Sequence, residues 1–225
     1  MSGKESGKNV LLKSWEVTPE DATPMLKQYL EIKKNYQNII LFYRMGDFYE
    51  TFFEDAVICS KELEITLTGR DAGRLGRIPM AGVPQKASES YISRLIDKGY
   101  KVAICEQVED SSLSKGLVER QVVRMLTAGT LTETNLLESR KNNYLASIVK
   151  NTKKNVYGLA YIDVSTAEFK ITELSYDQLV SELARISPSE IIAPSKKQQL
   201  QQHQIVAEEI PDLPKHILEN YNCTK

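Results

Sequence analysis

Apolar and polar positions along the first 130 residues follow patterns typical of short strands and helices. Runs rich in β-branched and aromatic residues predict strands, whereas apolar residues at near-helical spacing predict helices. The predicted strands span residues 39–43, 48–52, 65–68, 101–106 and 118–126. The predicted helices span 24–35, 54–63 and 88–97, and a flexible loop is expected over 69–76. Together these elements predict an α/β domain with a mixed sheet.

The second half of the chain places several strands before its first helix. Predicted strands span 145–149, 157–164 and 168–174, and a helix over 177–186 and a short strand at 191–193 follow. This order matches a ribonuclease H-like α/β layer. A further helix over 196–203 and a strand over 204–206 are expected, but after Pro211 the pattern predicts no final element. The expected parts are a flexible tail (1–22), a first domain (23–129), a linker (130–143) and an incomplete second domain (144–225).

The overall composition, 41% hydrophobic and 26% charged, fits a globular protein with a core. No apolar run approaches the ~18 residues of a membrane span, and the polar, Lys-rich N-terminus lacks the apolar segment of a secretory signal. The three cysteines, Cys59, Cys105 and Cys223, form no CxxC pair. They predict reduced thiols rather than disulfides or a zinc site, and hence a reducing cytoplasm.

Charge gives a local signal rather than a global one. The net charge of −1 provides no basic field that would attract nucleic acid. Between residues 69 and 101, however, basic residues outnumber the acidic residues Asp71, Glu89 and Asp97. The basic residues are Arg70, Arg74, Arg77, Lys86, Arg94, Lys98 and Lys101. On charge alone, a basic face and an ordinary mixed surface are equally good interpretations.

Signatures of catalysis are weak. The sequence has no GxxxxGK[ST] loop, and neither His203 nor His216 has a recognisable nucleophile beside it. Asp163 is the carboxylate that invites a nuclease hypothesis, but a two-metal nuclease needs several converging carboxylates, and only Glu168 is placed to approach it. The residues favour Asp163 as a turn carboxylate satisfied by backbone amides. We therefore expect no catalytic residue and no metal site.

The predicted hairpin over residues 43–50 carries a more informative pattern. In strand geometry Phe48 and Glu50 point to one face and Tyr49 to the other. A ring beside a carboxylate suits a probe inserted among bases, because the ring can stack while the carboxyl meets a base edge. The pattern by itself favours the alternative, with Phe48 in the core and Glu50 as a solvated charge at the edge.

The segment Leu41–Glu50 closely resembles the Phe-x-Glu mismatch-recognition motif of the MutS family and its surroundings. Further blocks at 23–29, 78–84, 102–107 and 114–130 keep the order and nearly the spacing of that family. The second half resembles the family's connector domain, mostly through residues 157–166 and 188–190. In form, these blocks are closer to bacterial members than to the nuclear paralogues.

The resemblance implies a role for the hairpin. Phe48 would stack on a mispaired or unpaired base from the minor groove of a kinked duplex, and Glu50 would hydrogen-bond that base. Arg70 matches a family position that approaches the DNA backbone. The other expected contacts come from local charge or from a place beside the pair, which gives six in all: Met45, Arg70, Arg74, Arg77, Met80 and Lys86.

The resemblance also implies what lies outside this chain. ATP and Mg²⁺ belong to the family's ATPase domain, so no cofactor is expected here, and the chain is expected not to be an enzyme. The implied partners are mismatched double-stranded DNA, a second MutS copy in a full-length homodimer, and MutL, in a cytoplasmic, nucleoid-associated setting without a membrane. Two rival functions are a nuclease built on Asp163 and an interaction scaffold with an idle mismatch site. Relatives of the latter kind usually lack the Phe-x-Glu pair.

Overall fold

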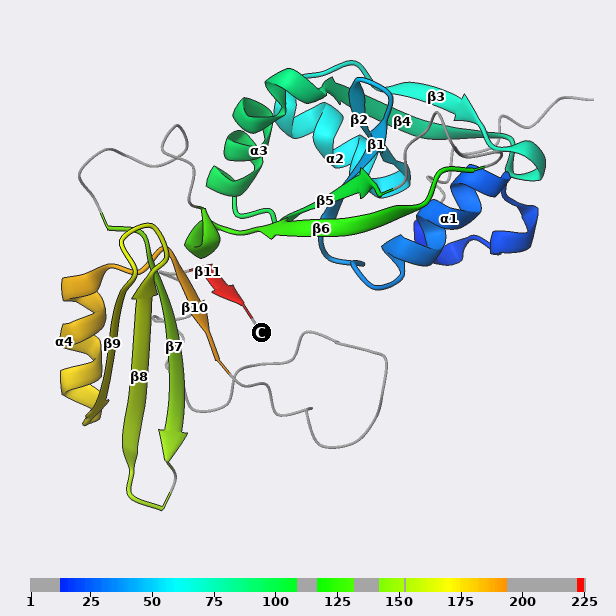
Figure 1. The fold of residues 1–225 in the computed structure, drawn as a ribbon. Coiled ribbons are helices and arrows are strands. Elements are labelled where there is room, and N and C mark those ends of the chain that lie inside the picture. Colours follow the sequence, from blue (N-terminus) through cyan, green and yellow to red (C-terminus); the bar gives the residue numbers. More distant parts are fainter. Residues whose placement is uncertain (1–12, 109–116, 132–141, 152, 194–221, 225) are drawn as a thin grey trace, which may run out of the picture. The chain divides into compact units, whose positions relative to one another are not determined.

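The computed structural model describes residues 13–108, 117–131, 142–151, 153–193 and 222–224 (Figure 1). The chain forms two compact units, Met1–Leu126 and Thr127–Lys225. Both combine helices with strands, which confirms the predicted α/β class. Within the described residues, no helix has the length and apolar character needed to cross a membrane.

A six-stranded mixed sheet organises the first unit. Its strand order is β3-β4-β2-β1-β5-β6, in which β1 and β5 run parallel and all other neighbours run antiparallel. The strands are β1 (Ile40–Met45), β2 (Phe48–Phe52), β3 (Thr68–Asp71), β4 (Arg77–Pro84), β5 (Val102–Gln107) and β6 (Arg120–Leu126). The predicted hairpin is therefore the β1–β2 pair, near the centre of this sheet.

Helices cover both faces of this sheet (Figure 1). They are α1 (Pro24–Lys33), α2 (Phe53–Leu63) and α3 (Ser88–Asp97). Helix α1 packs through Tyr29 against Tyr43 and Phe52, with ring centroids 5.5 and 4.9 Å apart. Helices α2 and α3 contact β4 and each other, and α3 also contacts β5. Apolar side chains on both faces thus fix the sheet on which the hairpin lies.

A buried ion pair ties α1 and α2 to the start of the hairpin. The Lys33 ammonium donates to Asp55 at 2.8 Å and to the Ile39 carbonyl at 2.7 Å. Asp55 also accepts the Leu41 amide at 2.9 Å and the Tyr29 hydroxyl at 3.4 Å. Burial raises the pKa of Asp55 to about 6, against the opposing effect of Lys33. Because a buried charge is tolerated only when it is paired, this cluster fixes where β1 begins.

The structure corrects two predictions in the first unit. The strand predicted over 65–68 begins only at Thr68, and the loop predicted over 69–76 contains the rest of β3 and a turn, η3 (Gly73–Leu75). The partner that makes β3 a strand is β4, which no local pattern predicts because Pro79 and Gly82 interrupt it. Long-range pairing has overridden local propensity.

Residues 13–22, predicted as part of a flexible tail, are instead structured. They form two short turns, η1 (Ser14–Glu16) and η2 (Pro19–Asp21). The amide and hydroxyl of Ser14 donate to the Glu54 carboxylate at 2.8 and 2.5 Å. A further turn, η4 (Gln85–Ala87), leads from β4 into α3. Specific hydrogen bonds, which composition does not reveal, anchor the start of the described chain.

The second unit follows the predicted order of three strands, a helix and a strand. These elements are β7 (Tyr144–Asn151), β8 (Val156–Asp163), β9 (Glu168–Leu174), α4 (Tyr176–Ile186) and β10 (Glu190–Ile192). The sheet order is β11-β10-β7-β8-β9, and α4 packs on one face (Figure 1). The prediction of no final element was wrong, because β11 (Asn222–Thr224) pairs in parallel with β10. Three residues are too short to give a periodic signal.

The predicted linker is anchored at both of its described ends. A short turn, η5 (Ala128–Thr130), opens this part of the chain. Leu131 and Asn143 are buried, and the Asn143 amide group donates to the carbonyls of Ala128 and Leu131 at 3.0 and 3.3 Å. The helix and strand predicted over 196–206 lie outside the described residues, as do His203 and His216.

Candidate nucleic-acid interface

The β1–β2 hairpin presents Phe48 on the surface of the first unit. Gly46 adopts a φ of +58° in the turn, a conformation that favours glycine, and Met45 pairs with Phe48 across it. Phe48 is 44% exposed, whereas Tyr49 is only 5% exposed. The predicted alternation is therefore observed, and the interpretation of Phe48 as a core residue is wrong.

A buried arginine braces this hairpin from β6. Arg120 is 8% exposed and donates to the Arg44 carbonyl at 2.9 Å and to the Gln28 side chain at 3.1 Å. Its guanidinium also lies 4.9 Å from the centroid of the Tyr43 ring, and the Tyr43 hydroxyl donates to Gln28. Burial raises the pKa of Tyr43 to about 12, so its hydroxyl remains a donor. Planar stacking and fixed hydrogen bonds suit arginine, and they limit movement of β1.

A second brace involves the residue between the two candidate side chains. The Tyr49 hydroxyl donates to the Glu106 carboxylate on β5. The Arg44 guanidinium lies 5.6 Å from the Tyr49 ring centroid and 4.0 Å from Glu106. Burial, with a contribution from Glu106, raises the pKa of Tyr49 to about 12. Tyr49 therefore anchors strand β2 to the sheet. The neighbouring side chains, Phe48 and Glu50, do not take part in this anchoring contact.

Registers across the sheet bring distant residues onto the face that carries the hairpin. Residues opposite each other in neighbouring strands share a face, so Glu50 lies beside Gly82 on β4. Phe48, Glu50, Gly82 and Met80 line an open hollow. The rest of its wall comes from Glu64, Ile65 and Thr66, in the segment that joins α2 to β3, and from Thr68 at the start of β3. Of these eight lining residues, the sequence predicted Phe48, Glu50 and Met80 as site residues. It did not predict the other five.

The Glu50 carboxylate is the chemically unusual group of the hollow. It is half-buried, and no residue in the described parts of the chain donates a hydrogen bond to it. Burial raises its pKa above the ordinary value, and the charge of Arg70 opposes that rise. A partly desolvated carboxylate without a donor is costly to the folded state unless a ligand supplies the missing hydrogen bond.

The other predicted contacts are not all brought together. Arg70 on β3 shares the face of the hollow, and its guanidinium lies 4.0 Å from the Met45 sulfur on β1. Lys86, on η4, is exposed, and the Gln85 amide next to it donates to the Asp47 carbonyl in the hairpin turn. Met45 is part of the hairpin, and these contacts place Arg70 and Lys86 near it.

Arg77 and Arg74 lie elsewhere on the first unit. The register pairs Arg77 with Asp71, one position away from the Arg70–Ile78 pair, so the Arg77 side chain lies on the opposite face. A Cβ added at Gly69, which is on that opposite face, would meet the Arg77 side chain, and this agrees with the register. Arg74, on η3, is highly exposed and lies 3.8 Å from Asp21.

Asp163 has the surroundings of a structural carboxylate. It is 1% exposed and accepts hydrogen bonds from the Asn143 amide, from the Ser165 amide and hydroxyl, and from the Thr166 amide. Burial by itself would raise its pKa, but these hydrogen bonds together lower it. Among the described residues, no group of three or more His, Cys, Asp or Glu could hold a metal ion. The hydrogen bonds to Asp163 confirm the prediction of a turn carboxylate satisfied by backbone amides.

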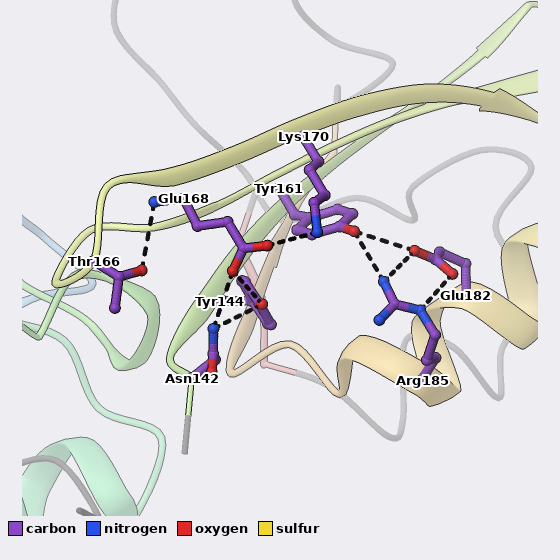
Figure 2. A network of polar contacts seen from close by, with 8 residues as sticks. All are labelled: Asn142, Tyr144, Tyr161, Thr166, Glu168, Lys170, Glu182 and Arg185. Atoms are coloured by element: carbon purple, nitrogen blue, oxygen red, sulfur yellow. Dashed lines mark hydrogen bonds and ion pairs between the residues drawn. The ribbon is translucent and has the colours of Figure 1, made fainter. Parts of the chain in front are cut away.

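The remaining charged cluster of the second unit pairs internally (Figure 2). The Tyr161 hydroxyl donates to Glu182 at 3.2 Å and accepts from Arg185 at 2.9 Å, while Glu182 and Arg185 form an ion pair at 2.6 Å. Glu168 accepts the Tyr144 hydroxyl at 2.8 Å. These contacts join β7, β8, β9 and α4, and they engage the carboxylates with neighbouring groups of the same unit. The hollow beside Phe48 is therefore the stronger candidate site.

Comparison with protein families assigns both units. Residues 23–135 match MutS domain I, and residues 143–222 match MutS domain II. The two matches follow one another along the chain: the first covers most of the first compact unit and extends past its end at Leu126, and the second covers most of the second unit. The hairpin and its hollow lie within the first match, and the paired cluster around Asp163 and Tyr161 lies within the second.

Three bacterial relatives, each named DNA mismatch repair protein MutS, are similar over most of this chain. The protein of Acetivibrio thermocellus is 56% identical over 174 residues, covering 76% of this chain and 20% of the relative. That of Clostridioides difficile is 54% identical over 170 residues, covering 76% and 18%. That of Dehalococcoides mccartyi is 52% identical over 178 residues, covering 79% and 20%. The chain spans about a fifth of the length of these curated relatives. With two matched domains in sequence and more than half of the aligned positions identical, the chain belongs to the MutS family.

Proposed function

We propose that this chain recognises mismatched double-stranded DNA in mismatch repair, and that Phe48 and Glu50 test the mispair. In the proposed complex the Phe48 ring stacks on a mispaired or unpaired base from the minor groove of a kinked duplex, and Glu50 hydrogen-bonds that base. The observation that supports the proposal is the open hollow in which an exposed ring lies beside a carboxyl that receives no hydrogen bond from the described residues.

The energetics of DNA deformation explain how such a pair discriminates. Inserting a side chain into the stack costs a few kcal/mol per base step, and less at a mispair, where stacking and pairing are already weakened. Stacking of a base on the Phe48 ring returns roughly 1–3 kcal/mol. A matched duplex therefore resists the insertion that a mismatched duplex permits. The braces on Tyr43 and Tyr49 reduce the cost of ordering the hairpin before it binds.

Glu50 adds chemical selectivity to this mechanical test. A carboxylate near phosphates is unfavourable, so it must meet a base donor or take up a proton. Burial raises the pKa of Glu50, which favours the second route. In either protonation state the group can form one hydrogen bond with a base edge, and a matched, stacked base does not offer that edge.

Backbone contacts would come from cations around the hairpin. Arg70 and Lys86, which lie near the hairpin, are proposed to contact phosphates, with Arg74 at a more distant position. Arg77 is on the opposite sheet face and is left out of this proposed contact. Such contacts fix position and register on the duplex but carry no sequence information. Met45 and Met80 are proposed to line the site.

Other functions are proposed for the longer proteins of the family. ATP and Mg²⁺ would bind an ATPase domain outside this chain, and the chain itself would contribute recognition without catalysis. A second MutS copy and MutL are the proposed protein partners, in the cytoplasm and at the nucleoid. Affinity of this chain alone would be low, because most phosphate contacts would come from other domains and from the second copy.

Binding in a full-length context tests the proposal. A chimera in which this chain replaces the matching segment of the Acetivibrio thermocellus MutS provides that context, and its affinity is measured for G·T and matched duplexes at one stated salt concentration. We expect the chimera to prefer G·T and the Phe48→Ala variant to lose that preference, with little change in affinity for matched DNA. Equal discrimination by the variant, or an unmodified chimera without preference, would contradict the proposal.

A further inference from the structure

Gly82 lies directly opposite Glu50 in the β2–β4 pair and forms part of the same hollow. A Cβ placed on Gly82 would come within 2.7 Å of the Glu50 carboxyl carbon and 3.0 Å of Oε1, and closer still to Oε2. These are the three nearest atoms to that position. Real Cβ atoms essentially never approach other heavy atoms so closely. The Glu50 carboxyl therefore occupies the space that any other residue at position 82 would fill.

Backbone geometry does not require glycine at this position. The glycines with positive φ in the described chain are Gly46, Gly73, Gly76 and Gly99, so Gly82 is not among them. It lies inside a regular strand, where glycine weakens the sheet relative to a residue with a side chain. A close approach by another group is the usual reason for a glycine in such a place, and here that group is the Glu50 carboxyl.

We propose that Gly82 is a positioning and specificity-determining residue, which lets the Glu50 carboxyl lie back against β4 and so sets how deeply a base edge must enter the hollow to meet it. This inference rests on the proposed function of Glu50. Without a side chain at position 82, the carboxyl lies against β4, in the hollow that Thr68 and Met80 also line, rather than projecting toward the duplex. Only a base displaced from the regular stack would reach it.

The lining of the hollow indicates which base edges it accepts. The Thr68 hydroxyl donates to the Met80 carbonyl at 2.9 Å, so its oxygen is left with acceptor capacity. The carboxyl groups of Glu50 and Glu64 and the Thr66 hydroxyl add further acceptors. A hollow rich in acceptors favours an imino or amino N–H of a displaced base and disfavours a phosphate.

The test is a double-mutant cycle in the chimera. Gly82→Ala adds one methyl group, whose nearest obstacle is the movable end of the Glu50 side chain, so the variant is expected to fold. We expect the G·T to matched affinity ratio to fall about tenfold, the size of one impaired base contact. In a Glu50→Ala background the same methyl group has nothing to displace, and Gly82→Ala is expected to leave the ratio unchanged.

Each outcome separates this inference from the proposed function. If Glu50→Ala lowers the ratio but Gly82→Ala does not, the role of Gly82 is refuted while that of Glu50 stands. If Gly82→Ala lowers the ratio equally with and without Glu50, the methyl group acts by another route, and the positioning role is refuted. If Glu50→Ala keeps full discrimination, the proposed function of Glu50 fails, and the inference fails with it.

Two further variants complete the design. Gly158→Ala is the matched control, because Gly158 also lies within a strand, β8, without a positive φ, and its Cβ would meet Val149 at 3.1 Å. It is expected to keep the full G·T preference. Glu50→Asp retracts the carboxyl by one methylene without adding any atom at position 82. It tests whether carboxyl position matters even if Gly82→Ala lowers the yield of folded protein. A comparable fall in the ratio is expected, and an unchanged ratio would overturn the inference.

Discussion

Two carboxylates, one in each unit, lie next to hairpin turns and differ in every other respect. Asp163, at the end of β8, is fully buried, accepts four hydrogen bonds from Asn143 and its own turn, and has a lowered pKa. Glu50, on β2, is half-buried, has no donor among the described residues, and has a raised pKa. The more buried group is thus the one better suited to its charge.

This difference shows that satisfaction, rather than burial, separates a structural acid from a candidate binding group. Hydrogen bonds to a charged group stabilise it when they form within the protein, and a group left without them retains that capacity for a ligand. Asp163 accepts its hydrogen bonds from within the protein, and these bonds fix the β8–β9 turn and the end of the linker. Glu50 can still accept hydrogen bonds from a ligand, and it lies beside the exposed Phe48 ring.

The largest expected effect is on stability, from Asp163→Asn. The amide nitrogen of asparagine would face either the Asn143 amide or the Ser165 and Thr166 amides, so donor meets donor in a buried place. We expect the free energy of unfolding of the second unit to fall by about 2–3 kcal/mol. The measurement is urea denaturation followed by circular dichroism.

Trp15, the only tryptophan, reports the first unit by fluorescence, and its unfolding transition should be unaffected. Glu173→Gln, at an exposed position on β9, is the control. An unchanged transition for Asp163→Asn would remove the structural half of the comparison.

Glu50→Gln should have the opposite profile. Stability reported by Trp15 should change by less than about 0.5 kcal/mol, because Glu50 accepts no hydrogen bond from the part of the chain that the structure describes. The preference for G·T over matched DNA should change by about tenfold, as expected for one altered base contact. A destabilised first unit with unchanged DNA preference would show that Glu50 is a structural residue after all.

The pH dependence of the two acids should also have opposite sign. The lowered pKa of Asp163 gives stability that is present above its ordinary pKa and is lost as pH falls through the lowered value. The raised pKa of Glu50 means that its charged form is penalised in the folded state, and this penalty disappears as pH falls below the raised value. Affinity for mismatched DNA should therefore rise as pH falls, because protonation removes a charge that repels phosphates. Glu50→Gln should flatten this trend, and an equally steep profile in the variant would contradict it.

A smaller effect on DNA binding is expected from Arg70, and none from Arg77, which lies on the opposite sheet face. Arg70→Ala should weaken binding to matched and mismatched duplexes alike and reduce the slope of log affinity against log salt by about 1. Arg77→Ala is its matched control and should change neither quantity, since its side chain lies on the other face. Equal effects of both substitutions would show that the register does not decide which cation meets DNA.

How much of this could be predicted from the sequence depends on the range of each interaction. The alternation at Phe48, Tyr49 and Glu50 is a local property of one strand, so the period-2 pattern predicted it correctly. The hollow is not local, because its wall comes from β3, β4 and the segment before them. Because residues 69–76 were predicted as a loop, strand β3 was missed. The alternation of side chains between the two sheet faces, which separates Arg70 from Arg77, was missed with it.

Gly82 and Arg120 also have roles that depend on contacts between distant segments, which local sequence patterns do not predict. Gly82 stands within a block that resembled the family, but its relation to Glu50 exists only once the β2–β4 register is formed. Arg120 falls in the predicted strand over 118–126, yet nothing in that pattern indicates that in the fold it is buried against Tyr43 and Gln28. Long-range pairing decides both roles, and periodicity within a single segment carries no information about it.

Crosslinking from position 48 shows directly whether the Phe48 ring meets the mispaired base. Photoreactive benzoylphenylalanine replaces Phe48 in the chimera, and the crosslinked nucleotide is mapped on a duplex with one G·T pair and on its matched counterpart. Crosslinks are expected to concentrate at the mispaired nucleotide, with few on the matched duplex. Crosslinks spread evenly along both duplexes would contradict a role for this ring in sensing the mispair.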